Sequence, residues 1–277
     1  MSLLSSNRLV VAIHPRGIDA LRLHRGRLPR SPIRLAERQR FDVAALPDDD
    51  APPWQRPLAL LRELAGSGAR HLHLVVSNHF VRYQLLPWES VVACKGDTQA
   101  LAQARFQLAF GDAAAGWQVL ADAPRFRSAS LAAAIDGQLL ASAREIAAAA
   151  GLQIAGIHPH LLAARQCMVK ESKKNTGTGW FAVFEPGRLT VLGSVQGRAS
   201  SLHNIRLHAP EALLPTLQQC VAADRLKSAA GGAVCLHAPG WSGDEAGMVS
   251  FVRLDGQEGA QGAHVDFGQA MAWCGSR

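Results

Sequence analysis

Apolar residues in the segment 180–207 fall into three short runs, at residues 181–184, 189–195 and 199–207. Turn-forming residues separate the runs, with Glu185-Pro186-Gly187 after the first and Gln196-Gly197-Arg198 after the second. Apolar runs of strand length divided by Pro and Gly turns predict a three-stranded antiparallel meander. A helix is expected next, because Pro210-Glu211 suits a first helical turn and the following apolar residues recur at helical spacing.

An earlier part of the chain repeats this plan. Strands are expected at residues 8–13, 18–23 and 29–41, with turns at residues 14–17 and 24–27. A helix at residues 57–66 then follows, as a helix follows the meander. Two halves that open alike predict an α/β protein made of two related units.

Between these two openings, the pattern predicts a small α/β lobe inserted into the first half. Two apolar runs on either side of Ser77-Asn78-His79 indicate a hairpin. The segments after it switch between helical and strand periodicity. They are a helix at 89–110, strands at 117–121 and 130–135, a helix at 137–150, a strand at 152–157 and a helix at 159–170.

The polar, glycine-containing stretch at residues 171–179 is expected to separate the two halves. The predicted domains are a first half at 1–170, an inserted lobe within it at about 89–157, and a shortened second half at 171–277. The second half should contain a buried strand at 233–237 and a hairpin of residues 248–254 and 264–267.

Composition places the chain among globular proteins. Its 277 residues are 48% hydrophobic and 18% charged, which allows two sizeable cores. No apolar run approaches the roughly 20 residues of a spanning helix, and residues 1–7 are too short for a signal peptide, so we expect a cytoplasmic protein. The five cysteines form no CxxC pair, which argues against disulfides and structural zinc.

The net charge of +7 is unevenly distributed, because eight arginines lie between Arg16 and Arg40. Such a cluster can make a weak contact with an anionic membrane surface. Alternatively, the arginines simply keep an edge hairpin in solvent and block pairing between edges. The cluster lacks aromatic residues that would stack on bases, so no nucleic-acid partner is expected.

Motifs of common enzyme and metal sites are missing. The sequence has no GxxxxGK[ST], HExxH, GxSxG or well-placed GxGxxG motif, and no catalytic residues are predicted. His71 with His73, and His158 with His160, are pairs that a metal ion could use. No Cys or carboxylate stands near them at ligand spacing, so we predict no metal site.

Three segments and the repeated opening of the halves carry a resemblance to a known group. The segments are SNHFVRYQLLPW, the expected helix ending in FQLAFG, and AREIAAAAGLQIAGIHPHLLAARQ. Together they resemble the PilM/GspL/MshI group of type IV pilus and type II secretion machines. The resemblance implies an actin-like fold (ASKHA, with ribonuclease H-like halves) and a cytoplasmic scaffold in an inner-membrane assembly platform. It also implies recruitment by the cytoplasmic tail of a bitopic membrane protein, PilN-like or GspL/GspM-like, and a possible homodimer.

Nucleotide-binding proteins of this fold hold ATP and magnesium between two hairpin turns that carry Asp-x-Gly. Here the first turn has His14 near the expected Asp, followed by Arg16 and Gly17. The second has Glu185 and Gly187, with Pro186 removing an N–H group between them. The resemblance thus implies a degenerate site, no ATP or magnesium cofactor, and a pseudo-ATPase. An active actin-like ATP-binding protein of the same machinery and a sugar-kinase-like enzyme are the alternatives.

The inserted lobe is not needed to close an actin-like core, so the resemblance makes its surface the expected place for a partner. The aromatic and basic residues expected there are Phe80, Arg82, Trp88, Arg105, Phe106 and Arg125. Alternatively, Phe80 and Phe106 fill the lobe's own core. Apolar grooves edged by arginines would suit a short peptide with acidic residues.

Overall fold

The structure is a computed structural model that describes residues 7–25, 33–43, 51–64, 67–88, 95–123, 126–171, 177–227, 231–239, 241, 251–253 and 267–276. The chain folds into two compact units, each built from segments that are distant in the sequence. Unit 1 comprises residues 1–80, 137–166 and 266–277, and unit 2 comprises residues 81–136 and 167–265. Within the described ranges, no helix is long and apolar enough to cross a membrane.

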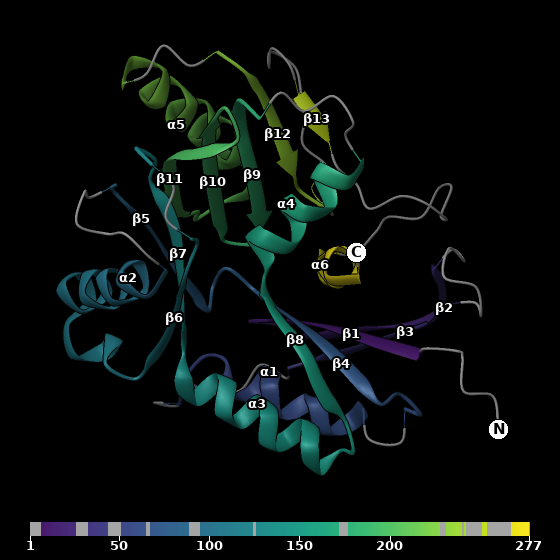
Figure 1. Ribbon diagram of the computed structural model, residues 1–277. Helices are drawn as coiled ribbons and strands as arrows, with labels where there is room; N and C mark the ends of the chain where they lie inside the picture. The colour runs from purple at the N-terminus through teal and green to yellow at the C-terminus, as the bar shows by residue number, and fades with distance from the viewer. Residues whose placement is uncertain are drawn as a thin grey trace. The chain divides into compact units, whose positions relative to one another are not determined.

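Unit 1 is built on a five-stranded sheet with the order β3-β2-β1-β4-β8 (Figure 1). Its strands are β1 (Asn7–His14), β2 (Gly17–Arg25), β3 (Ile33–Asp42), β4 (His71–Val76) and β8 (Gln153–Pro159). The first three form an antiparallel meander, while β4 and β8 run parallel to β1. Residues 10–13 of β1 are fully buried, because both faces of this central strand are covered.

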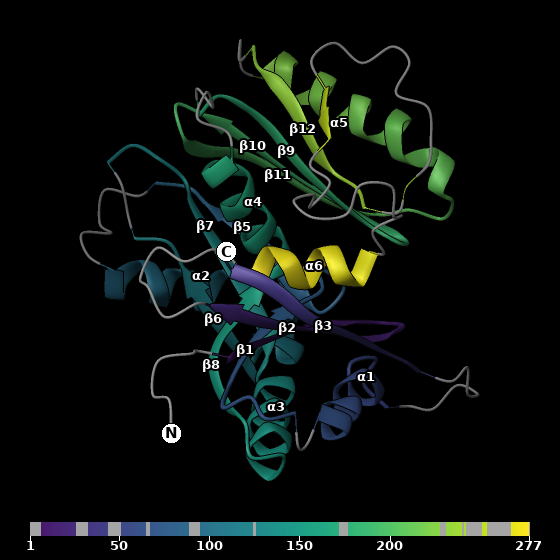
Figure 2. The same cartoon turned by 90° about the vertical axis from the view of Figure 1, so that its right-hand side faces the viewer.

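Helices cover both faces of this sheet. The α-helix α1 (Gln55–Ala59), the 3₁₀-helix η1 (Leu60–Leu64) and α3 (Gly137–Ala149) lie on one side, and α6 (Phe267–Ser276) lies on the other (Figure 2). The predicted helix at residues 57–66 is thus a short α-helix that tightens into a 3₁₀ turn. Gly268 and Gly275, seven residues apart, face the strands, and a Cβ atom on Gly275 would collide with Val75. The two glycines therefore allow α6 to pack closely against β1 and β4.

The first sheet of unit 2 contains the predicted meander. Strands β9 (Gly179–Glu185), β10 (Arg188–Val195) and β11 (Arg198–Arg206) are antiparallel, as the sequence predicted. β12 (Ala233–His237) and β13 (Phe251–Arg253) extend the sheet in parallel, giving the order β11-β10-β9-β12-β13. The 3₁₀-helix η3 (Pro210–Ala212) leads into α5 (Leu213–Lys227), whose apolar face packs on this sheet.

A three-stranded sheet of the order β5-β7-β6 also belongs to unit 2. Its strands are β5 (Val81–Leu86), β6 (Trp117–Ala121) and β7 (Ser130–Asp136), and α2 (Lys95–Phe110) with η2 (Gly111–Ala114) packs against it. The Gln99 side chain of α2 donates to Val119 O and accepts from Ala121 N. This side chain covers the open edge of β6, which would otherwise invite pairing with another chain.

The predicted hairpin around Ser77-Asn78-His79 is wrong. β4 pairs with β1 and β8, whereas β5 pairs with β7 in the other unit's sheet. Ser77 N donates to Ile13 O at 3.0 Å, and the buried Asn78 Oδ1 accepts from Leu161 N at 3.2 Å. These residues are held inside unit 1, so the chain leaves the sheet here instead of turning back along β4.

The compact units also differ from the predicted domain boundaries. The lobe is formed by residues 81–136, because β8 joins the first sheet and does not pair within the lobe. Residues 266–277 belong to unit 1, where α6 contacts β1. Of the predicted hairpin near the C-terminal end, residues 251–253 form strand β13, parallel to β12, whereas Phe267 begins a helix and not a strand. Residues 254–266 lie outside the described ranges.

Candidate functional site

The β1–β2 turn contains the predicted nucleotide residues Arg16 and Gly17. Arg16 is exposed, and its carbonyl oxygen accepts from Val43 N at 2.8 Å. Gly17 has φ +148°, and a Cβ atom there would collide with the carbonyl oxygen of Phe41 on β3. A glycine at this position therefore permits the close approach of β3. This contact alone accounts for the glycine, without a role in phosphate binding.

Gly17→Ala should lower the free energy of unfolding of unit 1 by about 2–3 kcal/mol, because the added methyl group meets backbone in a strained conformation. Gly151 is a matched control, with φ +73° and no atom within 4 Å of the position that an added methyl group would take. Gly151→Ala should cost only about 1 kcal/mol. Urea unfolding of the two variants provides the comparison, and equal costs would contradict the role assigned to the β3 contact.

His14 takes the place of the expected aspartate and is buried. Its Nε2 lies 2.9 Å from Oδ2 of Asp19, which is also buried. Helix α6 lies directly against this pair, since a Cβ atom on Gly268 would collide with the Asp19 carboxylate and lie 2.8 Å from His14 Nε2. A hydrogen-bonded histidine–aspartate pair under a helix thus occupies the part of unit 1 next to the first turn.

The β9–β10 turn of unit 2 contains the predicted Glu185 and Gly187. Glu185 is fully buried at the end of β9, and Gly187 has φ +83°, as the second central residue of a Pro-Gly turn requires. The Gly187 carbonyl accepts from Leu207 N at 3.0 Å. Burial lowers the pKa of the neighbouring Arg188, and Arg82 adds to this effect while Glu185 opposes it. The turn thus joins two neighbouring interior strands, β9 and β10, and this connection accounts for its conformation.

The predicted partner-binding residues fall into different environments. Phe106 is fully buried in the lobe core, and Phe80 is buried in unit 1, so both serve packing. Arg82 on β5 and Arg105 on α2 are half-buried. Trp88 is 36% exposed and remains a candidate for contact with a partner. Arg125 lies outside the described residues.

The structure adds residues around Trp88 that sequence reasoning missed. Phe126 is 70% exposed and packs edge-on against Trp88, with ring centroids 5.3 Å apart. The Arg127 guanidinium lies 5.2 Å from the centre of the Phe126 ring, and Arg198 Nη1 donates to Phe126 O at 3.5 Å. We call Trp88, Phe126, Arg127 and Arg198 the aromatic tip. An aromatic residue between two arginines in a polar loop was the available sequence signal.

A buried carboxylate on α5 is a second feature that was missed. Asp224 accepts from Trp180 Nε1 at 2.9 Å and from Ser201 Oγ, and its other oxygen lies 2.9 Å from His203 Nε2. Strand β11 has a bulge at Ser200, opposite Gly193 and Ser194 of β10. Ser200 and Ser201 lie there beside a cavity of about 310 Å³, which Asp224 also lines. Asp224 follows Leu217 and Val221 on the buried face of α5, which was a usable sequence signal.

The Arg16–Arg40 cluster is partly paired with carboxylates. Arg22 lies 3.3 Å from Glu37, and Arg40 lies 2.9 Å from Asp42. Surface pairs of this kind contribute little to stability, but they reduce the charge that is free to meet a membrane. A weak contact with an anionic surface therefore stays a prediction.

The two predicted histidine pairs are rearranged in the fold. His71 and His73 lie on one face of β4, as expected, but His73 stacks on His158 of β8. His160 instead begins α4 (His160–Glu171) and is fully buried.

No family model matches the sequence, and no curated protein matches it either. The structure is similar to the cytoplasmic domain of EpsL, an inner membrane component of the type II secretion system of Vibrio cholerae, with 9% identity and a TM-score of 0.57. That likeness covers 98% of this chain and 94% of the EpsL chain.

Two further structures show the same likeness. A PilM–PilN type IV pilus biogenesis complex matches with 12% identity and a TM-score of 0.56, over 83% of this chain and 81% of that one. A Bacteroides thetaiotaomicron protein with an actin-like ATPase fold and unknown function matches with 10% identity and a TM-score of 0.55. That match covers 87% of this chain and 84% of the Bacteroides chain. The chain therefore has an actin-like α/β fold, which confirms the fold class predicted from the sequence.

Proposed function

We propose that this protein is an actin-like scaffold of a type IV pilus or type II secretion-like assembly platform. In this proposal it is cytoplasmic and is held at the inner membrane by the cytoplasmic tail of a bitopic membrane protein. The observation that carries the proposal is the likeness to EpsL and to the PilM–PilN complex over most of each chain. Both of those proteins belong to inner-membrane or pilus assembly systems by their descriptions.

We infer further that the nucleotide site is degenerate and that the protein is a pseudo-ATPase. Three features support this inference. His14 replaces the first acidic residue and is engaged by Asp19, Gly268 of α6 lies against that pair, and Pro186 removes an N–H group from the second turn. The ligands that magnesium prefers are carboxylates and phosphate oxygens, and the first turn offers an imidazole and a guanidinium instead.

Calorimetric titration of the purified chain with Mg-ATP should show no binding in the micromolar range. The expected reason is the missing carboxylate at the first turn together with the occupied space beside it. Micromolar binding would support the alternative of an active actin-like ATP-binding protein. In that case Arg16→Ala should abolish binding, since Arg16 is the exposed cation of the turn.

The aromatic tip is our candidate for the surface that meets the membrane partner. Exposed aromatic rings beside arginines suit a peptide that carries an apolar anchor and acidic residues. Most large hydrophobic side chains that are exposed in the described chain also belong to the lobe, at Trp88, Leu108, Phe110, Leu120 and Phe126. This concentration supports the lobe, and not α5, as the docking region.

Capture experiments test the proposed function directly. The purified chain would be immobilised and offered the cytoplasmic segments of bitopic membrane proteins encoded beside it, with the same segments in scrambled order as controls. One intact segment should be retained at micromolar concentration. Retention of none of the intact segments would contradict recruitment by a bitopic partner.

A further inference from the structure

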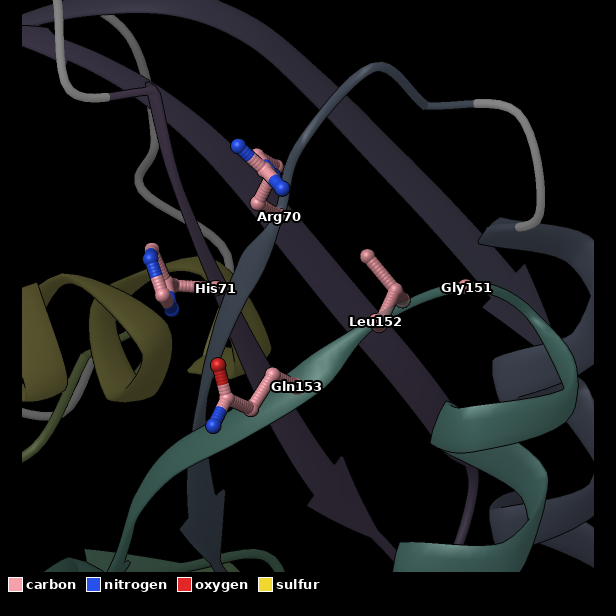
Figure 3. Close-up of a pocket in the computed structure, with 5 residues that line it drawn as sticks. All are labelled: Arg70, His71, Gly151, Leu152 and Gln153. Atoms are coloured by element: carbon pink, nitrogen blue, oxygen red, sulfur yellow. The ribbon is translucent and has the colours of Figure 1, made fainter.

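One face of the unit 1 sheet carries a group of basic side chains, with Arg8 and His71 where β1 and β4 begin and His158 near the end of β8. We call this group the histidine patch, and it consists of Arg8, His71, His73 and His158. A cavity of about 500 Å³ adjoins it where β4 and β8 begin, lined by Arg70, His71, Gly151, Leu152 and Gln153. Figure 3 shows His71 and Gln153 pointing to the same side of the two strands.

Strand register explains why these side chains gather. Arg8 of β1 pairs with His71 of β4, and His71 pairs with Gln153 of β8. Paired residues of neighbouring strands point to the same face of a sheet, and so do residues two apart, such as His71 and His73. The pairing between β4 and β8 shifts by one residue between Leu72 and His73.

Gly156 forms the floor between the two half-buried histidines. The His73 and His158 rings are stacked, with centroids 6.2 Å apart and planes inclined by 11°. A Cβ atom on Gly156 would lie 2.7 Å from His158 Nε2 and 3.5 Å from His73 Nδ1. The missing side chain therefore leaves room for the His158 ring, and one nitrogen of each ring lies near the same point.

Among the residues that the structure describes, no carboxylate forms an ion pair with the patch. Within the described part of the chain, neither Arg8 nor Arg70 forms an ion pair. Burial lowers the pKa of His73, and Arg8, His158 and His71 lower it further by repulsion. Burial also lowers the pKa of His158. Helix α6, which packs on this face at Val10 and Val75, contains no acidic residue in Phe267–Ser276.

We propose that the histidine patch binds a phosphate group. A phosphate offers several acceptor oxygens and a double negative charge, which matches Arg8, the ring nitrogens and the Gln153 amide. A metal ion fits less well, because within the described part of the chain the three histidines do not bring three ring nitrogens close together. Arg8 and His71 lie at the opposite end of β1 and β4 from the His14 turn, so these residues are separate from the degenerate nucleotide site.

Titration of the full chain with inorganic phosphate, followed by the NMR signals of the histidine rings, tests this proposal. Saturating phosphate should raise the pKa of His73 and His158, because the anion favours their protonated forms. Arg8→Gln and His73→Gln should each weaken binding by about tenfold or more, as expected for loss of one charge-assisted hydrogen bond.

Matched control variants show whether the loss of phosphate binding comes from the patch itself or from removal of any basic side chain in unit 1. Arg62 and His24 are exposed residues of the same unit outside the patch, and Arg62→Gln and His24→Gln should bind phosphate as the wild type does. Absence of a saturable response in the wild type would overturn the proposal. Phosphate binding by the Arg8→Gln and His73→Gln variants that is as tight as in the wild type would overturn the proposal as well.

Vesicle flotation distinguishes the two sources of such a phosphate. If the patch takes a lipid headgroup, vesicles of phosphatidylglycerol should retain the chain, vesicles of phosphatidylcholine should not, and inorganic phosphate should compete. If it takes a soluble phosphate compound, the NMR response should appear while flotation is unchanged by Arg8→Gln. Both sets of results require phosphate binding by the histidine patch. Failure of the partner-capture experiment would contradict the proposed function but would not affect either set of results.

Discussion

Asp224→Ala is expected to lower the free energy of unfolding of unit 2 by about 3–5 kcal/mol, as for loss of one partner from a buried charged network. The carboxylate is buried and joins Trp180, Ser201 and His203, which come from β9 and β11, to helix α5. Without it, the Trp180 indole N–H and the Ser201 hydroxyl group lose their acceptor inside the unit. The helix and the edge of the sheet then lose their polar connection.

Urea unfolding followed by circular dichroism measures this effect, and Glu211→Ala is the control. Glu211 is an exposed acidic residue just before the same helix, so its removal should cost less than about 0.5 kcal/mol. A cost below about 1 kcal/mol for Asp224→Ala would contradict the structural role of the network.

The contribution of Asp224 should also depend on pH. Burial acts to raise the pKa of its carboxyl group, but hydrogen bonds from Ser201, His203 and Trp180 outweigh burial and lower the pKa below its usual value. A lowered folded-state pKa stabilises the protein above the unfolded value of about 3.9, and that stabilisation is lost as pH falls through the folded-state pKa. The difference between wild type and Asp224→Asn should therefore shrink in acid.

Trp88→Ala combined with Phe126→Ala is expected to weaken capture of the membrane partner's cytoplasmic segment by about a hundredfold or more. Aromatic residues dominate the binding energy of many interfaces, and loss of two adjacent rings removes a whole anchor. Both rings are exposed in the described structure, so the thermal midpoint of the variant should change little. Fluorescence anisotropy with the labelled segment measures the affinity.

Leu226→Ala is the matched control for this double variant. Leu226 is 90% exposed on α5 of the same unit, and its removal should leave capture unchanged. Arg127→Glu with Arg198→Glu should weaken capture in a salt-dependent way, because the proposed segment is acidic. Normal capture by the Trp88/Phe126 variant would move the docking site away from the aromatic tip.

Local pattern was enough to predict most elements of the fold. The β9–β11 meander, the helix after Pro210 and the strands β6 and β7 were all expected near their observed positions. Each is set by short-range features, namely apolar periodicity and Pro or Gly turns. The order of these elements then indicated the actin-like fold that the comparisons confirm.

Strand partners could not be predicted in the same way. Periodicity shows that residues 71–76 and 81–86 are strands, but it does not show that they belong to different sheets. The buried polar residues Ser77 and Asn78 looked like a turn, because burial of their side chains is a tertiary property. The same limit explains why Phe106 was proposed for partner binding although it fills the lobe core.

The buried networks were hidden for a related reason. Asp224 and its donors are separated by 21 to 44 residues, and they meet only when helix α5 packs on the folded sheet. The histidine patch depends on the register of three parallel strands, which the sequence does not specify. Long-range placement of polar groups therefore had to come from the structure.

The packing of α6 on β1 has a consequence for how the protein folds during synthesis. β1 leaves the ribosome early, but the face of the sheet that Gly268 and Gly275 cover stays open until residues 267–276 have been made. Residues 81–136 and 167–265 of unit 2 are complete before that moment. Because contacts between distant segments form slowly, unit 2 should reach its native state first, and nascent unit 1 should be the part that needs chaperone protection.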